Sequence, residues 1–149
     1  VEAFCKKCSE VGIDGLIIPD LPINFFEQNY KSIFRDYDLY NMFLIAPQTP
    51  EERIRHIEKI SNGFIYMVSS SSVTGSKNTF DNNQLAYFDK IKEMNLSSKK
   101  IIGFGVGNKE TFNTAIQYSK GAIIGSAFIK HLKLKGVNSI DEFIKSIRE

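Results

Sequence analysis

The sequence predicts an α/β fold, namely an eight-stranded parallel barrel of the (β/α)8 TIM type, here an incomplete barrel that carries strands four to eight. Three observations lead to this prediction. Short apolar runs alternate with amphipathic stretches of helical period, which is the pattern of βα units. Each run is apolar throughout, which is typical of parallel strands buried on both faces. Glycine-rich turns follow the last two runs, where such barrels commonly bind phosphate.

The predicted strands are short apolar runs that end at Gly, Pro, Asp or Ser. They cover Gly15–Ile18, Met42–Ala46, Gly63–Val68, Lys100–Phe104 and Gly121–Ile124. Since helices separate them, neighbouring strands are expected to be parallel.

Helices are expected before the first strand and after each strand, because apolar residues recur there at helical spacing. They cover Ala3–Val11, Phe25–Tyr37, a segment with Pro50 at its first position, Leu85–Met94, Glu110–Tyr118, the short helix Ala127–Leu132, and a last helix after Ser139.

Two helix starts carry capping signals. Asn108 is the expected cap of the helix that covers 110–118. Ser139 and Glu142 have the spacing of a capping box for the last helix. The buried stripe of that helix is expected to consist of Ile140, Phe143, Ile144 and Ile147.

Composition excludes several classes of protein. Lys and Arg number 19 against 17 Asp and Glu, and they are scattered, so no nucleic-acid footprint is expected. No apolar run approaches the roughly 20 residues of a membrane span, and no leader is recognisable at Val1, so a cytoplasmic location is expected.

Neither the cysteines nor the histidines predict a metal site. Cys5 and Cys8 form a C-x-x-C within a helix, without a second pair, and are expected to be packing cysteines in a reducing compartment. His56 and His131 are each alone on a helix and are expected to be solvated rather than metal ligands.

An open doubly wound sheet is the competing architecture, and the turns decide against it. A dinucleotide fold would have its glycines after the first strand, but here that strand is followed by Pro19–Pro22, which contains no glycine. The glycines instead lie at Gly103–Gly107 and Gly125–Ala127. If these follow strands seven and eight, residues 1–149 are the C-terminal part of a single barrel domain. Since such barrels need roughly 250 residues, about 100 would precede this part.

The late turns suit a phosphate group, because glycine lets backbone N–H groups approach the anion and a helix N-terminus adds a favourable field. Gly105, Gly125 and Ser126 are therefore candidate phosphate-binding residues. The alternative is that the glycines only relieve crowding at the strand ends. The long polar segment 69–83, centred on Val73–Gly75, is expected to act as a lid, with a plain solvent-exposed linker as its alternative.

Several separated motifs occur in an order that resembles the tryptophan synthase alpha subunit family. They are Gly12–Gly15, Pro19–Pro22, Tyr66–Ser69, Val73–Gly75, Gly103–Val106 and Gly125–Ala127. The resemblance implies retro-aldol cleavage of indole-3-glycerol phosphate to indole and glyceraldehyde 3-phosphate. It also implies no cofactor in this subunit, and a pyridoxal-phosphate-dependent beta subunit as the partner in an alpha2-beta2 assembly.

The resemblance assigns roles residue by residue. The substrate phosphate would be bound by Gly75, Gly105, Gly125 and Ser126. The indole pocket would be lined by Tyr66 and Phe104, with Ile17, Pro19 and Ile45 as its apolar wall, and Thr74 would anchor the lid.

The family's catalytic residues are a Glu and an Asp after barrel strand two. They are expected upstream of Val1, so no catalytic residue is expected in this chain. Pro19 stands where the family commonly has a small residue, and Gly107 where it commonly has Ser.

Two other functions compete with this one. Another phosphate-binding barrel, an isomerase or epimerase, would share the glycine turns. A non-catalytic module could bind a beta-type partner through Pro19–Pro22 and the lid. In either case, five parallel strands on their own would leave open sheet edges, so poor solubility or dimerisation is expected.

Overall fold

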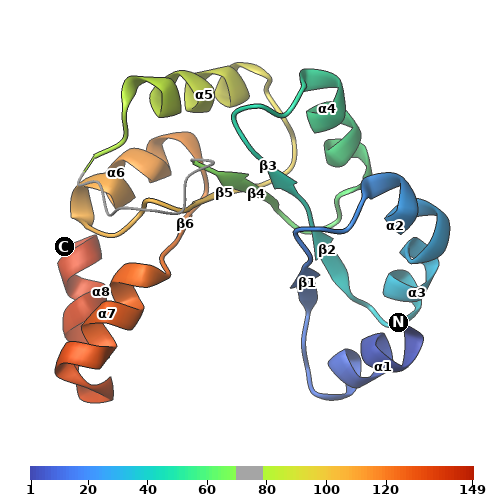
Figure 1. Ribbon diagram of the computed structural model, residues 1–149, viewed down its shortest axis with the longest axis horizontal. Coiled ribbons are helices and arrows are strands. Elements are labelled where there is room, and N and C mark those ends of the chain that lie inside the picture. The colour runs from blue at the N-terminus through green and yellow to red at the C-terminus, as the bar shows by residue number, and fades with distance from the viewer. Residues whose placement is uncertain (70–78) are drawn as a thin grey trace.

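The computed structural model describes residues 1–69 and 79–149 as an open arch of parallel strands lined on its outside by helices. Figure 1 shows the strands along the inner surface, with α1 at one foot of the arch and α7 and α8 at the other. The two ends of the chain therefore lie at opposite feet. This is the expected shape for part of a β/α barrel.

All strand pairs are parallel, and each strand lies next to its neighbour in the sequence. The strands are β1 (Gly15–Ile17), β2 (Tyr40–Met42), β3 (Leu44–Ile45), β4 (Ile65–Val68), β5 (Lys100–Gly103) and β6 (Ala122–Ile123). Only Phe43 separates β2 from β3, and its carbonyl accepts a hydrogen bond from the Tyr66 N–H at 2.8 Å. The run 40–45 is thus one barrel strand, pairing with β1 through its first half and with β4 through its second. The five predicted strands are confirmed.

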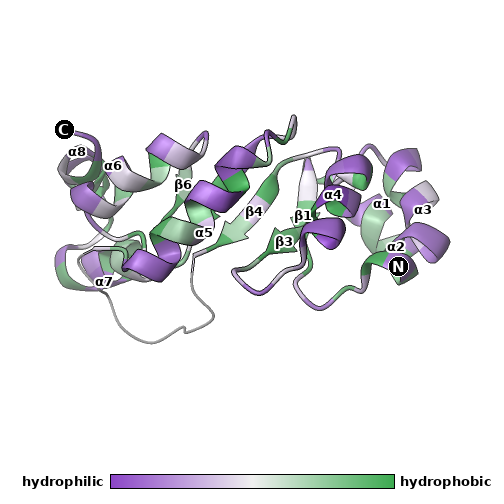
Figure 2. Ribbon diagram, turned by 90° about the horizontal axis from the view of Figure 1, so that it is seen from above, coloured by the Kyte–Doolittle hydropathy of each residue, from purple (hydrophilic) through white to green (hydrophobic). Residues whose placement is uncertain are grey.

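Helices cover the outer face of these strands. They are α1 (Glu2–Glu10), α2 (Ile23–Asn29), α3 (Lys31–Asp36), α4 (Glu51–Ile60), α5 (Asn82–Glu93), α6 (Lys109–Tyr118), α7 (Ser126–Lys135) and α8 (Ile140–Arg148), with the short 3-10 helix η1 (Val137–Ser139) before α8. Figure 2 shows apolar β3 and β4 beside helices of mixed polarity. The helices are amphipathic because one side faces the sheet.

The two faces of the sheet differ in exposure. In the run 40–45 the odd-numbered residues are buried against the helices, since Asn41, Phe43 and Ile45 are each at most 6% exposed. The even-numbered residues point to the concave side, where Tyr40 is 47% exposed. The concave side is the surface that would be the interior of a closed barrel.

The helix predicted over 25–37 is interrupted. Tyr30 leaves helical geometry with φ −124° and ψ −17°, so α2 and α3 are separate. Just before the break, the side-chain amide of Asn29 donates to the Phe25 carbonyl at 2.9 Å. Asparagine side chains compete with the backbone in this way and weaken a helix. Pro50 likewise lies one position outside α4, as its N-cap residue with extended geometry.

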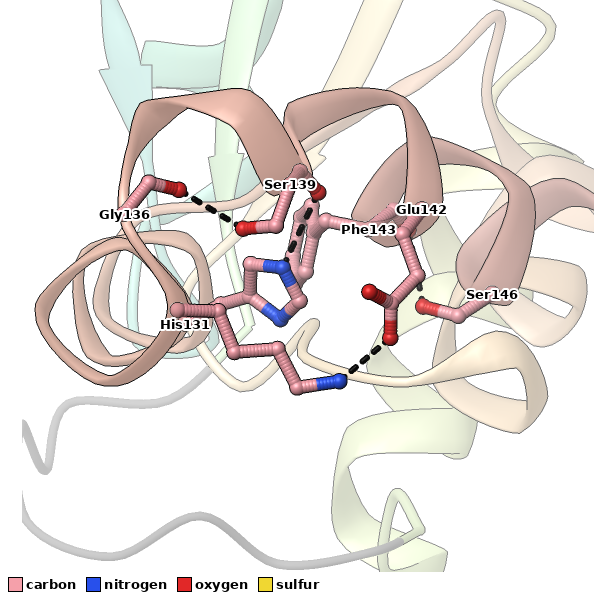
Figure 3. A network of polar contacts seen from close by, with 7 residues as sticks. His131, Gly136, Ser139, Glu142, Phe143 and Ser146 are labelled. Atoms are coloured by element: carbon pink, nitrogen blue, oxygen red, sulfur yellow. Dashed lines mark hydrogen bonds and ion pairs between the residues drawn. The ribbon is translucent and has the colours of Figure 1, made fainter.

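The predicted capping box before α8 is wrong. Ser139 instead donates its hydroxyl to the Gly136 carbonyl at 2.7 Å, and Glu142 pairs with Lys135 of the preceding helix (Figure 3). Gly136, with φ +75°, turns the chain so that η1 packs back on α7. The Ser139 hydroxyl and the Glu142 carboxylate therefore bond to Gly136 and Lys135 instead of to each other's backbone N–H groups. Asn108, in contrast, caps α6 as predicted, with Oδ1 accepting from the Thr111 N–H at 2.8 Å.

Apolar side chains remain exposed at both feet of the arch. On α8 only Phe143 and Ile147 of the predicted stripe are buried, while Ile140 and Ile144 are 40% and 45% exposed. Phe4 and Val11 are exposed at the other foot. His131, expected to be solvated, instead packs on Phe143, and its Nε2 lies 3.0 Å from the Ser139 carbonyl oxygen (Figure 3).

Replacing Tyr87 by phenylalanine is expected to stabilise the protein. Tyr87 is 5% exposed, and its hydroxyl has no hydrogen-bond partner among the described residues. A buried unpaired hydroxyl costs about 1–3 kcal/mol, so Tyr87→Phe should raise the free energy of unfolding by about 1 kcal/mol. Urea unfolding at neutral pH measures this, and Tyr40→Phe, at a half-exposed ring, should change nothing.

The same substitution should flatten the alkaline loss of stability. Burial raises the pKa of Tyr87 far above its ordinary value near 10. A group with a raised folded pKa gives stability that is present below its unfolded pKa and lost as pH rises above it. Stability should therefore fall from about pH 10 upward in the parent and less in Tyr87→Phe; equal slopes would contradict the assignment.

In the part of the chain that the structure describes, no helix has the length and apolarity needed to cross a membrane.

Candidate functional site

The turn after β5 has an unusual backbone. Phe104 and Gly105 have consecutive positive φ angles of +64° and +74°. Glycine adopts this left-handed conformation readily, whereas phenylalanine does so at a cost. The turn lies at the carboxyl end of the strand, which is where barrels of this type place their functional groups.

The turns after β5 and β6 come together in space. A Cβ atom placed on Gly107 would lie 3.3 Å from the Cβ of Ala127, the second residue of α7. Thr111, itself buried, holds this turn in place, because its hydroxyl oxygen accepts from the N–H groups of Gly107 and Asn108 at 3.1 and 3.2 Å. The two predicted glycine turns are therefore neighbours, although seventeen residues separate them in the sequence.

Helix α7 begins within this cluster of turns. Gly125 is its N-cap residue and supplies no side-chain cap, and Ser126 is its first residue. Both are exposed, and no atom of the described residues lies within 4 Å of a Cβ placed on Gly125. The first N–H groups of a helix have no partner within the helix, so this open end can hydrogen-bond an anion.

An aromatic pair lies beside the turns. Tyr66, the second residue of β4, meets Phe104 edge to face, with 6.1 Å between the ring centroids. Burial raises the pKa of the Tyr66 phenol above its ordinary value. Phe104 is 41% exposed on the concave side. The pair thus places one exposed aromatic ring, that of Phe104, and one buried ring, that of Tyr66, beside the turn after β5.

Only part of the predicted pocket wall lies on the concave side of the sheet. Ile17 is 42% exposed and pairs in register with Met42, on the concave side. Pro19 is exposed in the turn after β1. Ile45 does not lie there, since it is 1% exposed in the helix-covered core and pairs with Met67, whereas Leu44 pairs with Tyr66. Successive strand residues point to opposite faces, so Leu44 takes the position expected of Ile45.

Thr74 and Gly75, the predicted lid anchor and the fourth phosphate residue, lie outside the described residues. The same holds for Val73 and for most of the predicted lid.

The described residues contain no group of three or more His, Cys, Asp or Glu side chains placed to hold a metal ion. His56 pairs with Glu27 at 2.7 Å on the outer surface, between α4 and α2. Cys5 and Cys8 are buried, free thiols.

Sequence reasoning missed two residues that shape the site. Gly103 lies under the Tyr66 ring, and a Cβ there would be 2.0 Å from the Tyr66 Oη. Ser69 is fully buried and donates its hydroxyl to the Phe104 carbonyl at 2.5 Å. A glycine inside an apolar strand can signal such a close approach. The sequence gives no such signal for Ser69, because it is the first of four consecutive serines.

Fold and turns together define the class: an open part of a parallel β/α barrel whose glycine turns lie together at the carboxyl ends of its last two strands. A family model described as "Tryptophan synthase alpha chain" matches residues 1–147. The chain belongs to the tryptophan synthase alpha chain family.

Its relatives are similar across the whole chain. It is 64% identical over 147 residues to the tryptophan synthase alpha chain of Flavobacterium psychrophilum, and 62% identical over 148 residues to that of Flavobacterium johnsoniae. Each alignment covers 99% of this chain and 58% of the relative. The chain thus spans somewhat more than half the length of the curated relatives it matches.

Solved structures agree on the fold. A mutant tryptophan synthase alpha-subunit from the hyperthermophile Pyrococcus furiosus superposes with a TM-score of 0.79 at 27% identity, covering 99% of this chain and 58% of that one. A tryptophan synthase complex from the same organism superposes with a TM-score of 0.75 at 24% identity, covering 98% and 57%. The predicted incomplete TIM barrel is confirmed.

Proposed function

We propose that residues 1–149 are the C-terminal part of a single barrel domain that cleaves indole-3-glycerol phosphate to indole and glyceraldehyde 3-phosphate. The observation that carries the proposal is the convergence of the β5 and β6 turns beside the Tyr66–Phe104 pair. A substrate with a phosphate at one end and an aromatic ring at the other needs these two surfaces next to each other. Membership of the tryptophan synthase alpha chain family supports the same substrate.

In this proposal the turns bind the phosphate. The N–H groups of Gly105 and of the start of α7, with the Ser126 hydroxyl, donate to its oxygens, and the α7 dipole favours its charge. The rings of Tyr66 and Phe104 contact the indole, with Ile17 and Pro19 further along the concave side. Gly75 and Thr74 keep their proposed roles in phosphate binding and in the lid.

The acid-base groups are proposed to come from outside residues 1–149. Cleavage needs one group that protonates the indole ring and another that removes the proton of the glycerol hydroxyl. A carboxylic acid that donates a proton near neutral pH needs a raised pKa, but the described carboxyl groups with a clear shift have lowered ones. Desolvation opposes the shift at Glu58, where hydrogen bonds from Ser97 lower the pKa, and Lys135 lowers that of Glu142.

We also propose a beta subunit as the partner, in an alpha2-beta2 assembly, with pyridoxal phosphate bound there and no cofactor in this subunit. The segment Pro19–Pro22, next to the concave side, is the proposed contact. We place the protein in the cytoplasm, in keeping with its free Cys5 and Cys8 thiols.

An activity assay tests the proposal. The protein at its native length, with and without a tryptophan synthase beta subunit, should release indole from indole-3-glycerol phosphate. Ribulose 5-phosphate serves as the competing ligand, because an isomerase or epimerase would also bind a phosphate but has no use for the aromatic pair. Binding of the sugar phosphate without binding of the indole compound would overturn the proposal.

A further inference from the structure

The Phe104–Gly105 turn needs a partner to hold it. A phenylalanine with φ +64° is in a sparsely populated conformation that persists only when its surroundings fix it. The Ser69 hydroxyl donates to the Phe104 carbonyl at 2.5 Å, and the Ser69 N–H donates to the Gly103 carbonyl at 3.0 Å. Ser69 therefore continues the hydrogen bonding between β4 and β5 by one side-chain bond, which reaches into the turn itself.

That bond also sets the direction of the Gly105 N–H. The Phe104 carbonyl and the Gly105 N–H belong to one planar trans peptide unit, so they point in opposite directions. Because the carbonyl points to buried Ser69, the N–H points away from it. The Gly105 Cβ position faces Ser69 as well, at 3.4 Å from its Oγ. Ser69 therefore does not obstruct the backbone donor.

Gln84, in the first turn of α5, controls the Ser69 hydroxyl. Its side-chain nitrogen donates to the Ser69 carbonyl at 3.2 Å and lies 3.4 Å from the Ser69 Oγ. A hydroxyl has one proton and two acceptor sites. With an amide donor on its acceptor side, the Ser69 hydroxyl is oriented to give its proton to Phe104.

We propose that Gln84 is a positioning residue for phosphate binding, acting through Ser69 to aim the Gly105 N–H at the anion. The inference rests on the proposed function and adds to it a residue that does not itself contact the phosphate. Gln84 also belongs to a capping box with Asp81, in which its Oε1 accepts from the Asp81 N–H at 2.9 Å and its own N–H donates to the Asp81 Oδ1 at 3.0 Å. A test must therefore separate capping from positioning.

Two substitutions achieve this separation. Gln84→Glu keeps an oxygen for the Asp81 N–H but replaces the donor facing Ser69 by an acceptor. Asp81→Ala removes the side-chain cap of α5 and leaves the Gln84 amide in place. Ser69→Ala removes the hydroxyl directly and is a second route to the same loss if Gln84→Glu folds poorly.

The measurements are the KM and kcat for indole-3-glycerol phosphate, the inhibition constant of inorganic phosphate, and the melting temperature, all on the protein at its native length. Gln84→Glu and Ser69→Ala should each raise KM and the phosphate inhibition constant about tenfold, since a hydrogen bond to a charged group is weakened, with little change in kcat. The double variant should be no worse than either single one. Asp81→Ala should lower the melting temperature and leave both constants unchanged.

If all three variants lower the melting temperature and leave KM and the phosphate constant unchanged, Gln84 only caps α5 and the inference is wrong. A parent protein that does not cleave the substrate would instead overturn the proposed function. Restoration of the parent constants in Ser69→Thr, which retains the hydroxyl, is expected and would exclude a general packing effect.

Discussion

Replacing Gly103 by alanine is expected to lower kcat/KM for indole-3-glycerol phosphate by about 100-fold, the loss that follows from a misplacement of about 1 Å in a catalytic site. The Tyr66 ring lies over Gly103 in the place that a side chain would occupy. An added Cβ would lie 2.0 Å from the Tyr66 Oη and 2.4 Å from its Cζ. Because Tyr66 is only 7% exposed and packs against Phe104, displacing its ring is expected to shift Phe104 as well. Steady-state kinetics of the protein at its native length measure the effect.

A double-mutant cycle shows whether the loss comes from Tyr66. Gly103→Ala should also cost about 1–3 kcal/mol of stability, as overpacking does. In a Tyr66→Ala background, which removes the ring, the same substitution should change neither stability nor kcat/KM further. Gly121→Ala is the matched control, because nothing lies within 4 Å of its Cβ position. Equal effects of the two glycine substitutions would argue against the contact with Tyr66.

The elements of the fold could be predicted because each strand is a continuous apolar run. Where polarity interrupts a run, the prediction fell short. The second strand begins at Tyr40, two residues before the predicted start. The prediction left out Asn41 because it is polar, yet its side chain is buried at 3% exposure. The Ser139–Glu142 box failed for a related reason, since spacing alone does not reveal that Gly136 and Lys135 offer competing partners.

The placement of the candidate site residues could be predicted where backbone geometry defines it, and not where it depends on which face of a strand a side chain occupies. Gly105, Gly125 and Ser126 have their positions set by the turns that contain them. In Leu44–Ile45 both residues are apolar, so periodicity cannot say which one faces the concave side, and Ile45 proved to face the core. Gln84 contacts Ser69 across fifteen residues, a contact that no local pattern encodes.

The polypeptide of residues 1–149, expressed by itself, is expected to self-associate. Its outermost strands β1 and β6 each have a single paired neighbour among the described residues, and unpaired strand edges favour association. The concave side exposes Ile17, Tyr40 and Phe104 at 41–47%. Sedimentation velocity should show mass increasing with concentration, whereas a monomer with a sharp melting transition would contradict this expectation.

The foot formed by α7 and α8 should contribute most to this association. Five apolar side chains are exposed there at 40–74%, namely Ile129, Leu134, Val137, Ile140 and Ile144. Burying a fully exposed isoleucine side chain is worth about 1.5–3 kcal/mol. Covering Ile144, which is 45% exposed, is worth about half of this, so Ile144→Lys should weaken self-association by about three- to tenfold. It should not lower the melting temperature, because Ile144 is 45% exposed and the core contacts of α8 are made by Phe143 and Ile147. Asn138→Lys adds the same charge at an exposed polar position and should leave association nearly unchanged. If both lysine variants weaken association equally, net charge rather than the apolar foot controls it.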